Sequence, residues 1–290
     1  MFTLTTDTAI DIFRNELDAM GVPYIPLTFT IDGITYEDRF TSNEDFEDFY
    51  AKIKKGAQPV TSQITPIAHE EFFEKVYAKN KLDIVHITLS SGLSKTYESA
   101  CMAADSFMKR NPDARVYIVD PLSATSATMP LFEKALAFRD EGAPASEAAE
   151  ALRAYSHRIQ TYVVPNDLFH LMRGGRLSAA AAIVGSAFKI KPIIVLNEEG
   201  KLVVYKKALG FNRAIKIIIE HIEEYCPNPC EKKFWIASAG AHEQVDYAKN
   251  QIEKRFPGAK VQIGWIGPVI GAHTGFGTMG VVFEGNSRLM

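Results

Sequence analysis

Hydroxyl side chains gather in two short segments whose positions suit anion binding. Thr61 and Ser62 come just before a predicted helix that begins near Pro66. Ser90 and Ser91 directly follow an apolar, strand-like run. Ligands of α/β proteins bind beyond the carboxyl ends of strands, and helix N-termini favour anions. The alternative is capping or turn chemistry, for which Ser and Thr are equally common.

Two later segments offer cations and a histidine. Arg173 and Arg176 flank two glycines, so a backbone turn would present fixed cations to a phosphate, a carboxylate or an acidic partner. The alternative is a solvated turn at a helix end, where glycine and arginine are both common. His273 and Thr274 lie in a glycine-rich, apolar stretch. A histidine there is usually a hydrogen-bonded core residue, but the glycines allow a ligand to approach the backbone closely.

Familiar catalytic and cofactor motifs are not supported. Residues 275–280 spell G-x-G-x-x-G, but they lead into an apolar strand and only ten residues follow. The helix and later acid of a dinucleotide site therefore have no room. The sequence has no phosphate-binding P-loop and no G-x-S-x-G nucleophile elbow. Cys226 and Cys230 lack a second Cys or His cluster, so we expect no metal site. Because no cofactor or catalytic motif is supported either, we also expect no cofactor and no catalytic residue.

The composition is that of an ordinary globular protein. The chain has 290 residues, 47% of them hydrophobic, and a formal net charge of −3. This length suits two domains, and the charge gives no basic stripe for nucleic acid. No apolar run approaches the roughly 20 residues of a membrane-spanning helix, and the N-terminus does not read as a signal peptide. With three cysteines, an odd number, we expect a cytoplasmic protein without a disulfide framework.

Strand-like and helix-like segments alternate along the chain, which predicts an α/β fold. The expected strands are residues 2–5, 24–30, 83–89, 116–119, 162–165, 193–196, 202–205, 234–237 and 261–265, with hairpin turns at 32–33 and 199–200. The expected helices are residues 9–20, 42–54, one from 66, one from near Leu93 to 109, then 131–139, 146–155, an Ala-rich helix at 179–188, 211–225 and 243–255. We place a domain boundary near residue 160, which gives domains 1–160 and 161–290.

Five segments together resemble the DegV family of bacterial fatty-acid-binding proteins. They occur in the family's order and cover the chain almost end to end. They are Thr61-Ser62-Gln63, residues 87–94 (ITLSSGLS), residues 173–178 (RGGRLS), Lys191-Pro192-Ile193 and residues 267–275 (GPVIGAHTG). Thr8, Ile64, Lys95 and Pro121 depart from the family's usual residues, which puts local backbone shape and acyl-chain preference in question.

The resemblance implies two α/β domains with mixed or parallel sheets and a long-chain fatty acid in a cleft between or within them. It implies that the carboxylate is held by hydroxyls and a histidine, which by position are Thr61, Ser62, Ser90, Ser91, His273 and Thr274. It also implies a lipid-binding subunit of phospholipid metabolism that presents the acid to a separate ATP-dependent fatty acid kinase. Arg173 and Arg176 would then serve partner binding, and residues 179–188 with Val269 and Ile270 would line the tunnel.

Two other functions fit the same residues. An acyl hydrolase or transferase would use Ser91 with His273 as its base, although the sequence signals no orienting acid. A carrier of another hydrophobic acid would need only a differently shaped cleft. Burial of a methylene contributes about 0.8 kcal/mol, so an acyl chain supplies ample binding energy for either carrier.

Overall fold

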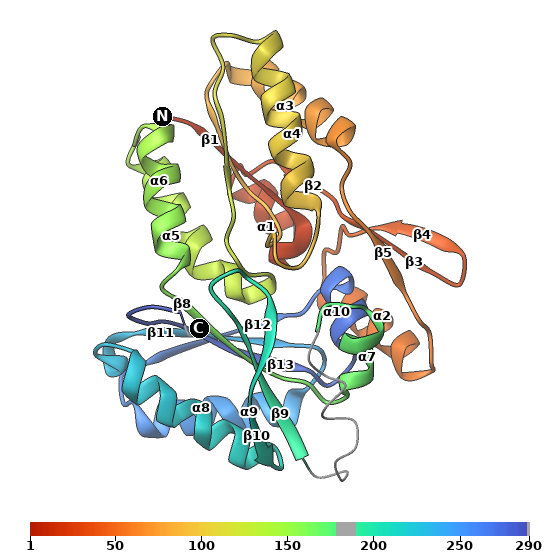
Figure 1. Ribbon diagram of the computed structural model, residues 1–290, viewed down its shortest axis with the longest axis vertical. Coiled ribbons are helices and arrows are strands. Elements are labelled where there is room, and N and C mark those ends of the chain that lie inside the picture. Colours follow the sequence, from red (N-terminus) through yellow and green to blue (C-terminus); the bar gives the residue numbers. More distant parts are fainter. Residues whose placement is uncertain (178–189, 289–290) are drawn as a thin grey trace.

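The N-terminal half is built around a four-stranded parallel sheet. The computed structural model describes residues 1–177 and 190–288 (Figure 1). The strand order is β2-β1-β6-β7, with β1 at Thr3–Asp7, β2 at Tyr24–Ile25, β6 at Ile84–Ile87 and β7 at Val116–Val119. Parallel strands need crossover connections, and helices supply them here.

Helices cover both faces of this sheet, as its alternating side chains require. Val85 and Ile87 pack with α1 (Arg14–Ala19), α5 (Met129–Asp140) and α6 (Ala145–Ser156). On the other face, Ile84 and Ile118 pack with α3 (Pro66–Asn80) and α4 (Thr96–Arg110). Figure 1 shows α5 and α6 on one side of β1 and α3 and α4 on the other.

The C-terminal half is a six-stranded mixed sheet in the order β10-β9-β8-β13-β11-β12. The strands are β8 (Ile159–Val164), β9 (Ile190–Leu196), β10 (Leu202–Leu209), β11 (Lys233–Ser238), β12 (Lys260–Trp265) and β13 (Met279–Glu284). One face packs on α8 (Phe211–Tyr225) and α9 (His242–Arg255) through side chains such as Phe234 and Ile236. The intervening Trp235 packs instead into the core of the N-terminal half. The two halves therefore share buried apolar surface.

A small antiparallel sheet lies beside the junction of the two halves. Its order is β4-β3-β5, with β3 at Thr28–Ile31, β4 at Ile34–Glu37 and β5 at Val60–Ser62 (Figure 1). Buried side chains of β3 join those of α2 (Asn43–Lys54) and α10 (Pro268–Thr274) in one cluster. Because β5 pairs with β3, Thr61 lies opposite Phe29, and β5 also contacts α10. The short helix α7 (Leu168–Arg173) packs against α10 from the other side.

The α/β fold with parallel and mixed sheets is confirmed, and several boundaries are corrected. Only Arg14–Ala19 of the helix expected at 9–20 is α-helical, because Asp11 takes a left-handed conformation (φ 59°) that ends a short 3-10 turn. Thr61 and Ser62 lie in a strand rather than a loop. Helix α4 begins at Thr96, three residues later than expected, and α10 was not predicted. The helix expected at 179–188 lies outside the described residues, and the boundary near residue 160 stays a prediction.

Among residues 1–177 and 190–288, no helix has the length and apolar character needed to cross a bilayer.

Candidate functional site

A cavity of about 240 Å³ opens where β5, the loop after β6, α7 and α10 meet; we call it the polar cavity. Both halves of the chain contribute to its wall. Hydroxyl, amide and charged side chains form one part of the lining, and leucines with Val269 and Ile270 form the rest. The polar members are Thr61, Ser62, Gln63, Ser94, Lys95, Arg176, His273 and Thr274. No carboxylate lies among the described residues of this wall.

Thr61 and His273 meet directly in the wall of the polar cavity. The Thr61 Oγ1 atom lies 2.8 Å from the His273 Nε2 atom, a hydrogen bond that joins residues 212 positions apart. The pairing of β5 with β3 positions Thr61, while α10 carries His273. Helix α10 is itself held at its start, where the Gly267 N–H donates to Asp11 Oδ2 at 2.7 Å. The site therefore depends on three segments that are remote in sequence.

The His273 imidazole is neutral at ordinary pH. Burial, together with the nearby Arg176 guanidinium, lowers the pKa of His273 to about 4. Burial disfavours the charged ring because water no longer solvates it, and a neighbouring like charge adds to the effect. With this ring neutral, the described wall of the polar cavity offers hydroxyl groups and the cations Lys95 and Arg176, and it contains no carboxylate. This arrangement is suited to an anionic ligand.

The Arg-Gly-Gly-Arg turn packs against His273 rather than standing free. A Cβ atom on Gly174 would lie 2.4 Å from His273 Nδ1, so only glycine lets the turn approach the ring this closely. Arg176 donates from Nε to the Leu93 carbonyl at 3.3 Å and lines the polar cavity. Arg173, at the end of α7, is exposed and does not line it. The two arginines therefore occupy different environments.

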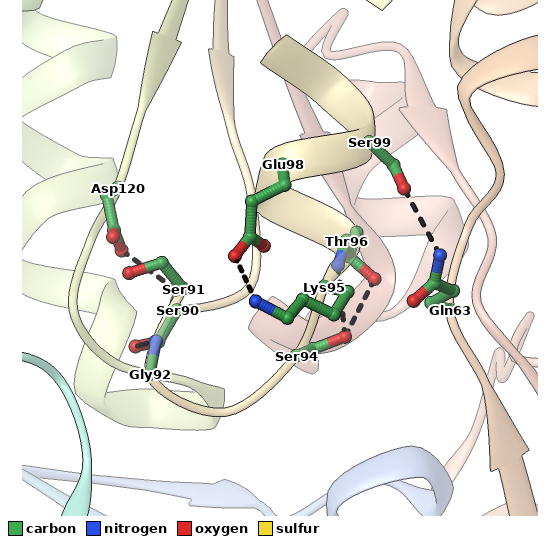
Figure 2. A network of polar contacts seen from close by, with 10 residues as sticks. All are labelled: Gln63, Ser90, Ser91, Gly92, Ser94, Lys95, Thr96, Glu98, Ser99 and Asp120. Atoms are coloured by element: carbon green, nitrogen blue, oxygen red, sulfur yellow. Dashed lines mark hydrogen bonds and ion pairs between the residues drawn. The ribbon is translucent and has the colours of Figure 1, made fainter. Parts of the chain in front are cut away.

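The serine loop after β6 presents a different serine to the cavity than the sequence suggested. Figure 2 shows Ser91 beside Asp120 and Ser94 beside Thr96. The Ser91 N–H donates to Asp120 Oδ1 at 3.3 Å, and buried Ser90 donates from Oγ to the Gly200 carbonyl at 3.1 Å. Ser94 Oγ accepts from the Thr96 N–H at 3.2 Å and lines the polar cavity. Ser94 is thus the serine of this loop that a ligand in the cavity would meet.

Gly92 sets the path of this loop against the β9–β10 turn. A Cβ atom on Gly92 would lie 2.5 Å from the Glu199 carbonyl oxygen and 2.5 Å from the Gly200 carbonyl carbon. Both contacts are to backbone, which cannot rotate away as a flexible side chain would. The glycine is therefore required for the close approach of the two loops.

We expect Gly92→Ala to lower the free energy of unfolding by roughly 1–3 kcal/mol, because the added methyl group overpacks a backbone contact. Urea denaturation followed by circular dichroism measures this change. Gly280→Ala is the matched control, since its Cβ would meet its nearest neighbour, the Tyr162 carbonyl, at 3.5 Å. Equal stability of the two variants would contradict the proposed close approach.

An apolar extension adjoins the polar cavity. This second hollow, of about 60 Å³, is here called the apolar cavity, and its wall is almost entirely hydrophobic. The two cavities share four wall residues: Leu93, Leu202, Ile270 and Thr274. Ala127, Val163 and Val282 continue the apolar wall toward the six-stranded sheet. An amphipathic ligand would thus find polar groups at one end and apolar groups at the other.

The structure brings together most of the residues that the sequence singled out. Thr61, Ser62, His273 and Thr274 line the polar cavity, and so do Val269 and Ile270 of the expected tunnel. Arg176, expected to bind a partner, also lines it. The cavity wall does not include Ser90, Ser91 or Arg173.

Sequence reasoning passed over three polar wall residues. Gln63 donates from Nε2 to Ser99 Oγ at 3.3 Å and so ties β5 to α4 (Figure 2). Lys95 pairs with Glu98 at 2.7 Å at the cavity mouth. Ser94 is the third, and its position two residues before the start of α4 was the signal that could have identified it.

The fold is mixed α/β, and a polar cavity and an apolar cavity adjoin where its two halves meet. The chain belongs to the DegV family: a family model described as "Uncharacterised protein, DegV family" matches residues 1–286. The chain is similar to DegV domain-containing proteins of Clostridium perfringens (32% identity, 99% of this chain and 98% of the relative) and of Streptococcus pyogenes serotype M3 (34% identity, 99% of each).

Solved structures give the same family. A DegV lipid-binding protein from Thermotoga maritima is 26% identical and matches with a TM-score of 0.83 over 100% of both chains. DegV from Bacillus subtilis, described as a fatty-acid-binding protein, is 25% identical with a TM-score of 0.84 over 98% of this chain and 99% of the other.

Proposed function

We propose that this protein binds a long-chain fatty acid, with the carboxylate in the polar cavity and the acyl tail in the apolar cavity. The observation that carries the proposal is the Thr61–His273 hydrogen bond in the wall of a cavity that shares four residues with an apolar extension. Fatty-acid binding in the Bacillus subtilis relative and lipid binding in the Thermotoga maritima relative support the same ligand class.

The polar wall offers several donors to a carboxylate. The Thr274 hydroxyl is buried and has no hydrogen-bond partner in the described part of the chain. Thr61 and Ser94 add hydroxyls, and Arg176 adds a positive charge. A buried carboxylate without donors is strongly unfavourable, whereas each hydrogen bond to a charged group contributes about 1.5–3 kcal/mol. The donor set therefore makes headgroup burial favourable.

Ligand extraction tests this proposal most directly. The protein is purified from a bacterial host, extracted with organic solvent, and the extract is analysed by mass spectrometry. We expect a fatty acid of about stoichiometric amount, and delipidated protein should rebind hexadecanoic acid in a titration. A protein that carries no acid and rebinds none with chains of C14 to C18 would refute the proposal.

Binding of the carboxylate should raise the pKa of His273 from about 4 toward its ordinary value of 6.5. The reason is that a negative charge beside the ring favours the imidazolium form. Because the pKa is higher in the bound state, binding takes up protons when the pH lies between the two values. NMR titration of the ring nitrogens, with His273→Gln to assign the signal, measures both states. An unchanged or lowered pKa would place the carboxylate elsewhere.

Presentation of the bound acid to a separate ATP-dependent fatty acid kinase is the second part of the proposal. Its support is the family resemblance together with the exposure of Arg173 outside the cavity wall. We expect Arg173→Glu to leave fatty-acid affinity unchanged and to reduce acyl-phosphate formation in a reaction coupled to such a kinase. Lys207→Glu reverses the charge of another exposed residue and is the control. Equal acyl-phosphate formation by both variants would remove Arg173 from the docking surface.

Two alternatives remain testable on the same site. An acyl hydrolase that pairs Ser91 with His273 is disfavoured, because the described structure shows no hydrogen bond between them and Ser91 is not in the cavity wall. Turnover of acyl esters that is abolished by Ser91→Ala would support it. A carrier of another hydrophobic acid, such as a retinoid, is distinguished by competition with hexadecanoic acid.

A further inference from the structure

A third cavity, of about 540 Å³, lies away from the proposed fatty-acid site; we call it the aromatic cavity. It opens where α1, α5, β11 and β12 meet. Its volume falls in the range of about 300–1,000 Å³ that is typical of small-molecule sites. Among the described residues, it shares no wall residue with the polar or apolar cavity.

The chemistry of its wall is aromatic and acidic. Phe13, Phe132, Trp235 and Trp265 supply four aromatic side chains. Glu16 and Glu133 supply two carboxylates, and no described wall residue is a lysine, arginine or histidine. Asp11 also lines the wall, but burial and the nearby Asp38 raise its pKa well above the ordinary value, which favours its neutral form. Aromatic faces and carboxylates both attract cations, so this wall favours a cation over an anion.

The chain's own lysine shows how this wall receives an ammonium group. The Lys233 Nζ atom lies 5.0 Å from the centre of the Trp235 ring and forms an ion pair with Glu133. The indole and the carboxylate thus act together on one cation at the edge of the cavity. Glu16 is exposed, and its carboxylate accepts the Phe13 N–H at 3.3 Å, so it remains open to a second cation.

We propose that the aromatic cavity binds a small organic cation of the quaternary or alkylammonium class. The cation would lie against the aromatic faces, with Glu16 as its carboxylate partner. Asp11 also lines the cavity, but it accepts the Gly267 N–H at the start of α10, so it is left unchanged in the tests below.

The two tryptophans of the chain make this site directly observable. The sequence contains only Trp235 and Trp265, and both line the aromatic cavity. Intrinsic tryptophan fluorescence therefore reports on this cavity, and it is measured on protein of known fatty-acid content because Trp265 also packs in one cluster with Val269 and Ile270 of the polar cavity. Choline is the probe, and 3,3-dimethylbutan-1-ol is its uncharged isostere, compared at constant ionic strength.

We expect choline to change the tryptophan fluorescence saturably and to bind about tenfold more tightly than the uncharged isostere, as a cation–π contact predicts. Glu16→Gln should weaken choline binding by about twofold to fivefold, the size of an exposed ion-pair effect, without changing isostere binding. Glu147→Gln is the matched control, because Glu147 also lies in the first turn of a helix but outside this wall.

A second pair of variants keeps the test independent of Glu16. Ala19→Lys adds an ammonium group to an exposed wall position and should abolish choline binding, whereas Ala51→Lys on α2, outside the wall, should not. Fatty-acid content measured by mass spectrometry should be the same in all four variants. Absence of saturable binding, equal affinity for choline and its isostere, or equal effects of the paired variants would each overturn the proposal.

Discussion

Replacing Leu202 with tryptophan is expected to weaken hexadecanoic acid binding while leaving octanoic acid binding little changed. Leu202 lies in the wall of both the polar and the apolar cavity, so the larger indole would close the passage between them. Each methylene kept out of the apolar cavity costs about 0.8 kcal/mol, and exclusion of four would weaken binding about two-hundredfold. A shorter acid does not depend on the extension and keeps its headgroup contacts.

Leu209→Trp is the matched control for this experiment. Leu209 lies on the same strand, β10, but its side chain is 73% exposed, so the same substitution there leaves both cavities open. Calorimetric titration of delipidated protein with the two acids gives the four affinities. Unchanged hexadecanoic acid binding by Leu202→Trp would show that the tail does not follow the proposed path.

Thr61→Val should weaken fatty-acid binding by about tenfold to 150-fold, since a hydrogen bond to a charged group contributes about 1.5–3 kcal/mol. Valine matches threonine in shape, so the loss measures the hydroxyl rather than packing. The substitution also removes the partner of His273 Nε2 at 2.8 Å. We expect Ser94→Ala to weaken binding in the same direction, because Ser94 lines the polar cavity.

The Ser91→Ala variant distinguishes the prediction from the cavity geometry from the prediction implied by the family resemblance. The resemblance assigns Ser91 to the carboxylate, whereas the structure places its backbone N–H on Asp120 and leaves it out of the cavity wall (Figure 2). We therefore expect Ser91→Ala to bind fatty acid nearly as well as the unaltered protein. A loss as large as that of Thr61→Val would return Ser91 to the headgroup site.

Elements with strong local patterns were predictable from the sequence. The isoleucine-rich helix expected at 211–225 is α8, and the apolar strand expected at 116–119 is β7. The Asp32-Gly33 turn joins β3 to β4 as expected. These elements were predictable because hydrophobic periodicity and turn residues are local signals, which can be recognised from a few neighbouring residues.

Helix α10 was not predicted because tertiary contacts, rather than its local sequence, stabilise it. It has seven residues with a glycine in the middle, too short to be stable by helix propensity. Asp11 holds its first turn, and Gly271 packs so closely that a Cβ atom there would lie 2.5 Å from Tyr50 Oη. Strand β5 was missed for the same reason, since its ladder is formed with β3, about thirty residues earlier.

The sequence by itself determined the α/β class, the family and most of the polar residues that line the polar cavity. Residue type and spacing alone indicate Thr61, Ser62, His273 and Thr274, and all four line one cavity. The tertiary structure alone decided that Thr61 pairs with His273, that Ser94 rather than Ser91 lines the cavity, and that Arg176 lies beside the histidine. The physical reason is that residue type is local, whereas a cavity is formed by contacts between remote segments, such as that between Thr61 and His273, which lie 212 residues apart.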